Sequence, residues 1–297
     1  MKLLLFDDYR PGVLKGDRVV DISRALPQVD RQGLPPVLCA EGLMETLIDR
    51  FGELRPKIEQ IVASEGGVPI SSVRIRPPLP RPSNALCAFS NYQDRPMATA
   101  SPLDFFHKSA TSIVGDGDTV ELPDIPEAEV FHPEPELAYV IGRAAKKVRE
   151  ADALNYVFGY LNFVDISARG IPNRRTTFFH KALETWAPMG PVITTADEIP
   201  DPQHVQVRLW LNGDLKQDYS TSAMTYPIRA QIEWLSQYLT LKPGDVISCG
   251  VHHVGLSPIN DGDRVEMECE GMERLHFTIR SYGPRKTAHW RPPGVPG

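Results

Sequence analysis

The sequence has few cysteines. Its four thiols, Cys39, Cys87, Cys249 and Cys269, lie far apart, which argues against a disulfide framework and against a thiolate metal site. It also has no apolar run that approaches the roughly 18 residues of a membrane-spanning helix. The apolar stretch at its start is short and is followed by two acids, unlike a secretory leader. These absences predict a protein of the reducing cytoplasm that does not enter a membrane.

A block of basic residues is also missing. The formal net charge is -6 at pH 7, and Lys and Arg form no stripe, so the electrostatic basis for nucleic-acid binding is lacking. Hydrophobic residues make up 41% of the 297 residues, which is enough to build a core, and this length favours two unequal domains. The composition therefore predicts a globular protein without a nucleic-acid partner.

Proline is frequent, with 28 residues, and most prolines separate periodic segments. The run Arg76–Pro82 cannot form a helix or a central strand, because prolines fix φ and lack an N–H donor. We interpret this run as the linker that leads from a small N-terminal α+β domain (1–75) into a main domain (76–282). The Pro- and Gly-rich residues 283–297 are expected to form a flexible tail.

Hydrophobic periodicity predicts that the main domain is built mostly of strands. The pair Asn212-Gly213 favours a hairpin, because these residues accept the positive φ that the turn needs. The fold class that follows is α+β, mostly β. The expected strands are Lys2–Phe6, Arg18–Asp21, Val205–Leu211, Val246–Cys249, Arg264–Glu270 and Arg274–Ser281, and the expected helical segments are Ala40–Ala63, Glu150–Tyr160 and Ile228–Leu239.

Two carboxylates stand two residues apart in the segment Glu134–Gly142, which has the pattern of a strand that ends in a glycine turn. Residues at this spacing point to the same face of a strand, so Glu134 and Glu136 would lie side by side, and His132 would share their face. Adjacent like charges repel unless a cation lies between them, and hard divalent ions prefer such oxygen ligands. Alternatively, both acids face water on an edge strand.

A third carboxylate, Asp165, stands in an otherwise apolar and aromatic segment. Burying it there is costly unless a cation pairs with it. Arg169 follows four residues later and has the fork geometry that binds a carboxylate with two hydrogen bonds. Asp165 and Arg169 could instead form an ion pair on the surface of a helix.

Taken in order, these motifs resemble the fumarylacetoacetate hydrolase family. The resemblance extends over residues 1 to about 281. The matching motifs are Glu-x-Glu-Leu-x-x-Val-Ile-Gly (134–142), Gly-Tyr-x-x-x-x-Asp-x-Ser-Ala-Arg (159–169), Lys181 before Pro188-Met189-Gly190-Pro191, Asn212-Gly213 with Gln217, Leu241-Lys242-Pro243-Gly244-Asp245, Gly262-Asp263, and, earlier in the chain, Ser90-Asn91-Tyr92 and Lys108 with Glu121-Leu122-Pro123.

This resemblance implies a mixed β-sheet roll with a small N-terminal domain, assembled as a homodimer. It also implies a Mg²⁺ ion (or Mn²⁺ or Ca²⁺) and a small 2-oxo acid or diketo acid as substrate. By the same resemblance, Glu134, Glu136 and Asp165 are the metal ligands, and Lys181 is a catalytic and substrate-binding charge for a developing enolate. Tyr92 and Arg169 would line the substrate pocket.

The sequence departs from the family at the lid. Hydrolytic members carry Asn-Tyr-x-x-His-x-x-Glu, whereas this chain has Arg95 in place of the His and Ala98 in place of the Glu. Arginine does not deprotonate near neutral pH, so Arg95 cannot act as a general base, although it can bind a substrate carboxylate. The usual route for activating water is therefore missing from this segment.

A second departure is Gly250-Val251-His252-His253-Val254-Gly255, where the family has Gly-Thr-Pro before its glycine, so that Val251 replaces a hydroxyl and two histidines stand beside it. One hypothesis is that His252 or His253 replaces the lid base as the catalytic acid/base. The alternative is that both are loop histidines that form hydrogen bonds or face water. A third departure, Gly170-Ile171-Pro172 in place of Asp-x-Gln, removes a polar substrate contact.

The leading functional prediction is a Mg²⁺- or Mn²⁺-dependent hydrolase. It would cleave a C–C bond in a small acylpyruvate or β-diketo acid through a metal-stabilised enolate. Two alternatives remain open. The first is an isomerase, tautomerase or decarboxylase of a 2-oxo acid, which needs only the metal and Lys181. The second is a family member that binds a metabolite without converting it.

Overall fold

The structure is a computed structural model of the chain, and it describes residues 1–26, 36–92, 100–172 and 176–288. Strands predominate over helices, which confirms the α+β, mostly β class. The described short 3₁₀ helices are Ser23–Ala25, Ile70–Ser72, Ala110–Ser112, Glu150–Tyr156, Ala196–Glu198, Pro202–His204 and Thr221–Ala223.

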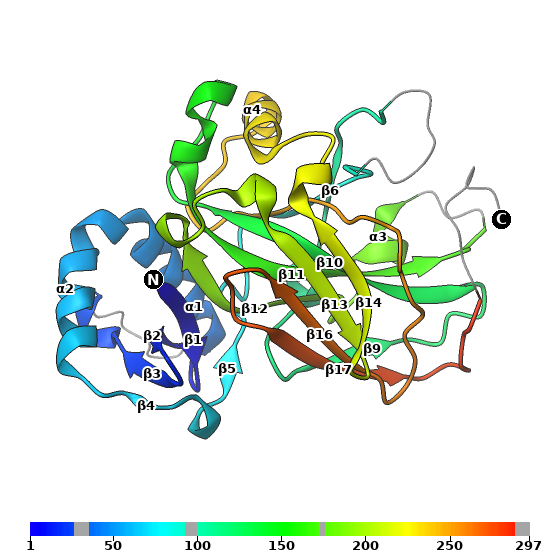
Figure 1. The fold of residues 1–297 in the computed structure, drawn as a ribbon, viewed down its shortest axis with the longest axis horizontal. Helices are drawn as coiled ribbons and strands as arrows, with labels where there is room; N and C mark the ends of the chain where they lie inside the picture. The colour runs from blue at the N-terminus through cyan, green and yellow to red at the C-terminus, as the bar shows by residue number, and fades with distance from the viewer. Residues whose placement is uncertain (27–35, 93–99, 173–175, 289–297) are drawn as a thin grey trace.

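A large mixed sheet runs through the molecule (Figure 1). Its central strands β10 and β11 are long, pair antiparallel over almost their whole length, and are buried except at the last residue of β11. The path through this sheet is β4 (Val68–Pro69), β3 (Arg18–Asp21), β2 (Arg10–Lys15), β1 (Lys2–Phe6), β12 (Ala187–Thr195), β11 (Val157–Arg169), β10 (Val130–Ile141), β15 (Val246–Ser248), β6 (Ala85–Ala88) and β7 (Phe105–His107), with β5 (Ile75–Arg76) beside β1 and β8 (Ile113–Val114) beside β12.

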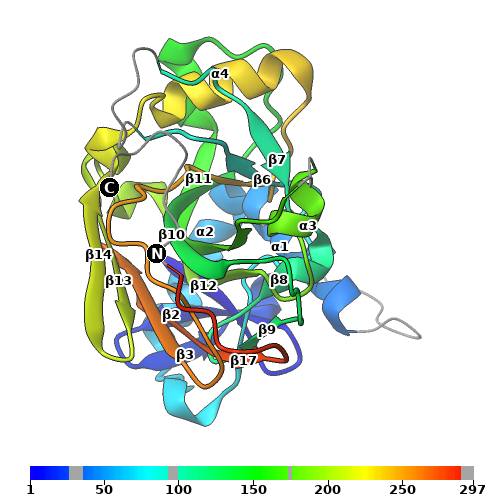
Figure 2. The same cartoon turned by 90° about the vertical axis from the view of Figure 1, so that its right-hand side faces the viewer.

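A second sheet of five strands packs beside the first through a shared apolar core (Figure 2). The expected hairpin is present, with Asn212 at φ 55° and Gly213 at φ 88° between two of its strands. The strand order is β14 (Asp214–Ser220), β13 (Gln206–Leu211), β16 (Arg264–Cys269), β17 (Leu275–Ser281) and β9 (Thr119–Leu122), so the strands predicted in this part of the chain are confirmed to within about two residues.

The N-terminal residues form a unit of strands β1 to β4 with helices α1 (Pro36–Asp49) and α2 (Phe51–Ser64), seen at the left of Figure 1. The single helical segment predicted for Ala40–Ala63 is therefore two helices, separated at Arg50. Strand β1 pairs with β12, so the sheet continues from this unit into the rest of the chain. The division into domains 1–75 and 76–282 stays a prediction.

Two further helices lie on the main part of the molecule: α3 (Thr177–Lys181) and α4 (Ile228–Tyr238). The second confirms its prediction, with Ile228, Ile232 and Leu235 buried on one face. The helix predicted at Glu150–Tyr160 is wrong beyond Tyr156, because Val157–Tyr160 begins strand β11. These valine and aromatic side chains favour a pleated, buried strand over a helix.

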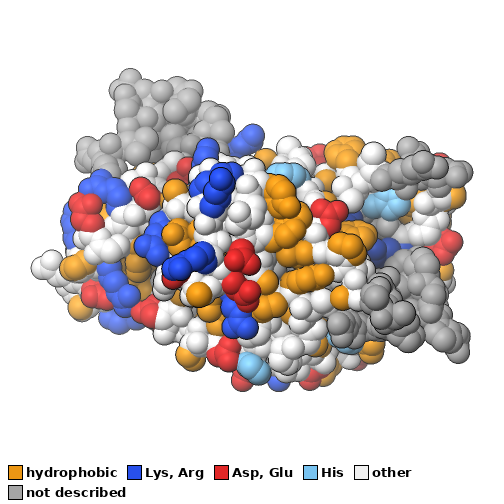
Figure 3. Space-filling view, turned by 90° about the horizontal axis from the view of Figure 1, so that it is seen from above, with side chains coloured by type: hydrophobic (Ala, Val, Ile, Leu, Met, Phe, Trp, Pro, Cys, Tyr) orange, Lys and Arg blue, Asp and Glu red, His pale blue; other side chains and the backbone are white. Residues whose placement is uncertain are grey.

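The described helices include none that is long and apolar enough to cross a membrane. On the face shown in Figure 3, Lys and Arg side chains are interspersed with Asp and Glu side chains rather than gathered into a stripe. In the predicted tail, residues 283–288 form no helix or strand, and residues 289–297 lie outside the described part.

Candidate active site

Three carboxylates meet on one face of the β10–β11 pair. Glu134 and Glu136 alternate with Pro135 along β10, and Asp165 on β11 lies directly opposite Glu134 in the strand register. Carboxylate oxygens of the three residues all lie within 4.8 Å of one another, and each residue is at most 2% exposed. The structure thus places Glu134 and Glu136 on one face, as the strand period predicts, and the cross-strand register brings Asp165 to them.

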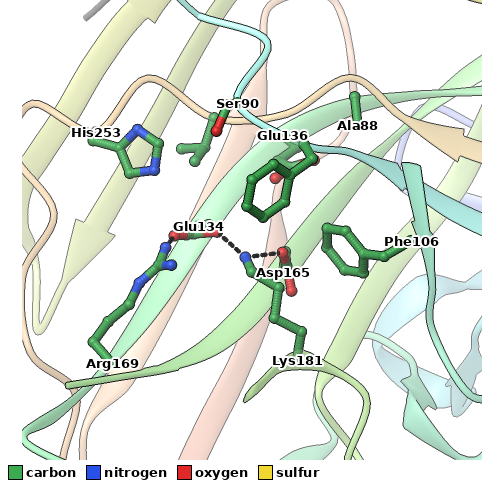
Figure 4. A pocket seen from close by; sticks show the side chains of 11 residues that line it. Ala88, Ser90, Phe106, Glu134, Glu136, Asp165, Arg169, Lys181 and His253 are labelled. Carbon is green, nitrogen blue, oxygen red and sulfur yellow. Dashed lines mark hydrogen bonds and ion pairs between the residues drawn. The ribbon is translucent and has the colours of Figure 1, made fainter. Parts of the chain in front are cut away.

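Two cationic side chains contact this cluster from the cavity side (Figure 4). The ammonium of Lys181, at the end of α3, lies 2.7 Å from Oε2 of Glu134 and 2.6 Å from Oδ2 of Asp165, and donates to the Ser167 hydroxyl at 2.7 Å. The guanidinium of Arg169, at the end of β11, pairs with the other oxygen of Glu134. The strand position of Arg169 excludes the alternative of a surface helix pair with Asp165.

A third cation, Lys108, does not line the cavity beside the cluster and forms an ion pair with the remaining oxygen of Asp165. Burial lowers the pKa of Lys108 and of Lys181, while the negative charge of Asp165 acts in the opposite direction on both. Sequence reasoning matched Lys108 to a family motif but assigned it no role at the site. Nothing in the local sequence indicates that it reaches Asp165, 57 residues further on.

The carboxylate of Glu136 accepts hydrogen bonds from neutral donors and, among the described residues, has no lysine as a direct partner. The hydroxyl of Ser248 on β15 and the N–H of Gly250 both donate to its Oε2, the latter at 2.9 Å. Burial and the nearby charge of Asp165 nevertheless raise the pKa of Glu136 to about 7. A side chain at residue 250 would not fit, because φ is +88° and a Cβ would lie 3.1 Å from Cβ of Asn91. Glycine here lets the N–H approach Glu136.

The cluster opens into a cavity of about 290 Å³. Its lining combines charged side chains with apolar ones. Six residues predicted as site residues line it: Glu134, Glu136, Asp165, Arg169, Lys181 and His253. The other lining residues are Ala88, Phe89, Ser90, Phe106 and Val251.

The two candidate histidines have different surroundings. His253 lines the cavity, and its ring lies above Glu134 in Figure 4. His252 instead stacks on the ring of Tyr219 at 5.7 Å between centroids and meets the edge of Tyr92 at 6.2 Å. Buried Gln217 donates to the carbonyl of His252 at 2.7 Å and so anchors this loop to β14. Of the two, His253 is the one that lines the cavity, and the acid/base role of either histidine stays a prediction.

Other predicted positions lie further from the cavity or outside the described residues. Tyr92 is buried against Tyr219 at 5.2 Å between ring centroids and does not line the cavity, so its substrate role stays a prediction. Arg95 and Ala98 fall within residues 93–99, which the structure does not describe. His132 is buried near Arg169 and His253, and burial followed by these charges lowers its pKa to about 3, so its imidazole is neutral.

Sequence reasoning also assigned no role to the hydroxyls of Ser167 and Ser248. Ser167 stands two residues after Asp165 on the same strand, so the strand period could have placed it in the site. Ser248 reaches Glu136 only because β15 pairs with β10, with Ser248 opposite Ala138. Such a long-range pairing has no local signal in the sequence.

Comparison with known proteins agrees with this geometry. The family model described as "Fumarylacetoacetate (FAA) hydrolase C-terminal" matches residues 84–280. The chain is similar to a maleylpyruvate hydrolase of Aquipseudomonas alcaligenes, with 30% identity over 297 residues that cover 95% of this chain and 100% of the relative. It is also similar to an oxaloacetate tautomerase of Bacillus subtilis, with 34% identity over 224 residues that cover 71% of this chain and 74% of the relative.

Among solved structures, the chain resembles a maleylpyruvate hydrolase from Sphingobium sp. SYK-6 in complex with manganese(II) ion and pyruvate. The TM-score is 0.83 and the identity 32%, and the match covers 96% of this chain and 100% of that chain. The family model matches most of the chain, and this relative is matched over its full length, N-terminal unit included. The chain therefore belongs to the fumarylacetoacetate hydrolase family.

Proposed function

We propose that this protein is a divalent-metal-dependent enzyme that hydrolyses a C–C bond in a small acylpyruvate. The observation that carries the proposal is the buried cluster of Glu134, Glu136 and Asp165 at the floor of a small cavity, with Lys181 and Arg169 in contact with it. The full-length similarity to maleylpyruvate hydrolases supports hydrolysis as the reaction.

The residues present fit a hard divalent cation. The cluster offers oxygen donors only, as Mg²⁺, Mn²⁺ and Ca²⁺ prefer, and it contains no thiolate or imidazole within the same group of ligands among the described residues. Burial and the charge of Asp165 raise the pKa of Glu136, and a bound cation would offset both effects. We propose Glu134, Glu136 and Asp165 as its ligands. When bound, such an ion supplies Lewis-acid stabilisation to neighbouring carbonyl and carboxylate oxygens.

The reaction consumes one water for each acylpyruvate. The water oxygen adds to the acyl carbonyl carbon, the bond from that carbon to the pyruvyl CH₂ breaks, and its electron pair goes to the pyruvate enolate. Protonation of the CH₂ carbon then gives pyruvate, and the acyl group leaves as a carboxylic acid. In this scheme the ammonium of Lys181 places a positive charge beside the forming enolate oxygen.

The base that activates water is proposed to be His253. It lines the cavity, whereas the usual lid pair is replaced by Arg95 and Ala98, neither of which can accept a proton near neutral pH. An imidazole has an ordinary pKa near neutrality, which suits it to take a proton from water and return it to the enolate carbon.

Arg169 is proposed to bind a second carboxylate at the far end of the substrate. Its guanidinium lies at the cavity wall and is already oriented by Glu134. Its fork geometry suits a carboxylate, which the acyl part of maleylpyruvate carries and a simple acylpyruvate lacks. R169M should therefore raise KM for maleylpyruvate much more than KM for acetylpyruvate. Equal increases for the two substrates would contradict this assignment.

A panel assay tests the proposed reaction. Metal-stripped protein is supplied with Mn²⁺ or Mg²⁺ and given maleylpyruvate, acetylpyruvate or oxaloacetate, and pyruvate release is followed with a coupled dehydrogenase. Fumarylacetoacetate is tested beside them, and its hydrolysis to fumarate and acetoacetate is followed by the loss of its ultraviolet absorbance. We expect metal-dependent pyruvate release from an acylpyruvate, with the activity lost in D165N and retained in the surface variant E268Q. Full activity after exhaustive chelation, or no release from any acylpyruvate, would overturn the proposal.

A second candidate is keto–enol tautomerisation of a 2-oxo acid. It is favoured by the similarity to an oxaloacetate tautomerase and by Lys181, since the ammonium and a bound cation suffice to stabilise an enolate without activating water. The same panel separates the two reactions. A tautomerase converts enol-oxaloacetate to the keto form in the presence of metal and releases no pyruvate from acylpyruvates, and it does not need His253 for water activation.

We also propose that the protein forms a homodimer and is located in the cytoplasm. Both proposals rest on the family resemblance and, for the location, on four cysteines that lie far apart in the sequence. Light scattering at micromolar concentration should give the mass of a dimer. A monomer mass would refute the predicted assembly without affecting the proposed chemistry.

A further inference from the structure

We propose that Lys108 is a positioning residue that fixes both Asp165 and Lys181 for metal binding, an inference that rests on the proposed function. Lys108 directly follows β7, and its side chain is completely buried. It does not line the cavity at the carboxylate cluster, so it cannot touch a substrate bound there. Any influence on the chemistry must therefore pass through the residues that it contacts.

The ammonium of Lys108 joins three segments of the chain. It donates to the carbonyl of Trp186 before β12 at 2.9 Å, to the carbonyl of Ile166 on β11 at 3.3 Å, and to the carbonyl of Lys181 at the end of α3. It also pairs with Oδ1 of Asp165. An ammonium has three protons and no acceptor, so all its donors are used within the protein. No other described lysine combines complete burial with contacts of this kind.

This arrangement orients the carboxylate of Asp165. Lys108 holds Oδ1 while Lys181 holds Oδ2 at 2.6 Å, so the plane of the carboxylate is fixed between two lysines. Each carboxylate oxygen has about two acceptor sites, so both oxygens keep capacity for a cation. Rotation of this side chain would break one of the two ion pairs.

The same ammonium also sets the place of Lys181. Helix α3 has only five residues, so it has few internal hydrogen bonds to hold its last residue. The contact from Lys108 to the Lys181 carbonyl attaches this residue to β11, where Asp165 and Ser167 receive its ammonium. Removal of Lys108 therefore disturbs a metal ligand and the cation beside it together.

If Lys108 only stabilised the fold, its loss would lower the melting temperature without a specific effect on metal affinity. A control variant at another buried charged residue distinguishes this role from a positioning role. Asp245 is also buried, and it accepts from the N–H groups of Asn84 at 3.0 Å and Lys242 at 2.8 Å, but it does not line the cavity. D245N should lower the melting temperature without changing the affinity for metal. It thus controls for loss of stability alone.

The experiment is a calorimetric titration of Mn²⁺ into metal-stripped, full-length protein, with melting temperatures measured beside it. K108M should weaken Mn²⁺ affinity by on the order of 10–100-fold, the usual effect of losing a residue that orients a metal ligand. D245N should bind as the wild type does, and K108R, which keeps the charge, should bind more tightly than K108M. If K108M does not fold, K108Q replaces it with the same expected loss.

Wild-type affinity in K108M, or equal weakening in K108M and D245N, would overturn the role of Lys108. Failure of the proposed function would give a different result, because in that case the wild type itself would bind no Mn²⁺. A second readout addresses the cavity: at saturating Mn²⁺, K108M should lower kcat through the displaced Lys181 while KM for the acylpyruvate changes little. An unchanged kcat at saturating metal would show that Lys181 does not depend on Lys108.

Discussion

The spacing Glu-x-Glu occurs on two strands of this protein in opposite environments. On β10, the side chains of Glu134 and Glu136 face the buried cavity. On β16, the side chains of Glu266 and Glu268 are 31% and 27% exposed, and Arg274 contacts them at 2.8 and 3.1 Å. The sequence pattern and the strand geometry are the same, but the first pair lines a cavity whereas the second is partly exposed to water.

The comparison shows which features mark a functional carboxylate pair. Water screens the charges of Glu266 and Glu268, and one arginine is sufficient to accompany them. The buried pair has Asp165 as a third carboxylate within 4.8 Å, and the group is accompanied by lysine and arginine side chains in place of water. Burial and a third carboxylate from a neighbouring strand, rather than the spacing, distinguish the proposed metal site from the exposed ion pair.

The largest expected difference is in the free energy of unfolding of two variants that each lose one cation. One variant affects the buried carboxylate cluster, and the other affects the exposed pair of Glu266 and Glu268. K181M leaves Glu134 and Asp165 buried without this partner and should cost about 3–5 kcal/mol of unfolding free energy in the metal-free protein. R274M removes a partly exposed cation and should cost less than about 1 kcal/mol. Urea unfolding monitored by circular dichroism measures both. Similar losses in the two variants would remove the distinction between the clusters.

The next contrast concerns the two histidines of one loop. H253A should lower turnover by on the order of 10²–10⁴-fold, the usual contribution of a general base. H252A removes a ring that packs on Tyr219 and should affect stability more than turnover. Steady-state kinetics at saturating metal decides between them. Robust hydrolysis in the H252A/H253A double variant would refute a histidine base for water activation.

The smallest expected effect is the pH dependence of stability that comes from the partly exposed His276. The protonated ring of His276 donates a hydrogen bond to Oδ1 of Asp116, 3.1 Å away, which raises the pKa of His276, so the imidazolium stabilises the folded state. This stabilisation is fully present below the unfolded pKa of about 6.5 and is lost as pH rises through the raised folded value. His276 is half exposed, so the effect should stay below about 1 kcal/mol.

Unfolding free energies of wild type and H276Q at pH 5.5 and 8.5 test this expectation. The wild type should lose slightly more stability than H276Q as the pH rises between these values. A wild type that gained stability relative to H276Q over the same range would contradict the assigned direction of the pKa shift.

Much of the site was predictable because strand periodicity is local. The alternation along β10 gave the shared face of Glu134 and Glu136, and the apolar setting of Asp165 indicated a buried charge. The Asn212-Gly213 hairpin and helix α4 followed from turn chemistry and from helical spacing. These features depend on residues close together in the chain, so the sequence carries them directly.

The rest depends on pairings between distant segments. The segment Glu150–Tyr160 carries a helix-like pattern, but pairing of β11 with β10 and β12 converts its second half to a strand. The reach of Lys108 to Asp165 and of Ser248 to Glu136 is set by the same long-range packing. The two histidines are adjacent in sequence, and only the anchored loop directs one to the cavity and the other to Tyr219.

The most direct test compares metal binding by matched glutamate-to-glutamine variants of the two Glu-x-Glu pairs. Each change removes one negative charge and keeps the side-chain size, once in the buried cluster and once at the surface. Calorimetric titration of Mn²⁺ into metal-stripped wild type, E136Q and E268Q should show one tight site in the wild type and in E268Q, and a large loss of affinity in E136Q. Binding of Mn²⁺ by E136Q with wild-type affinity would contradict the assignment of Glu134, Glu136 and Asp165 as the metal site.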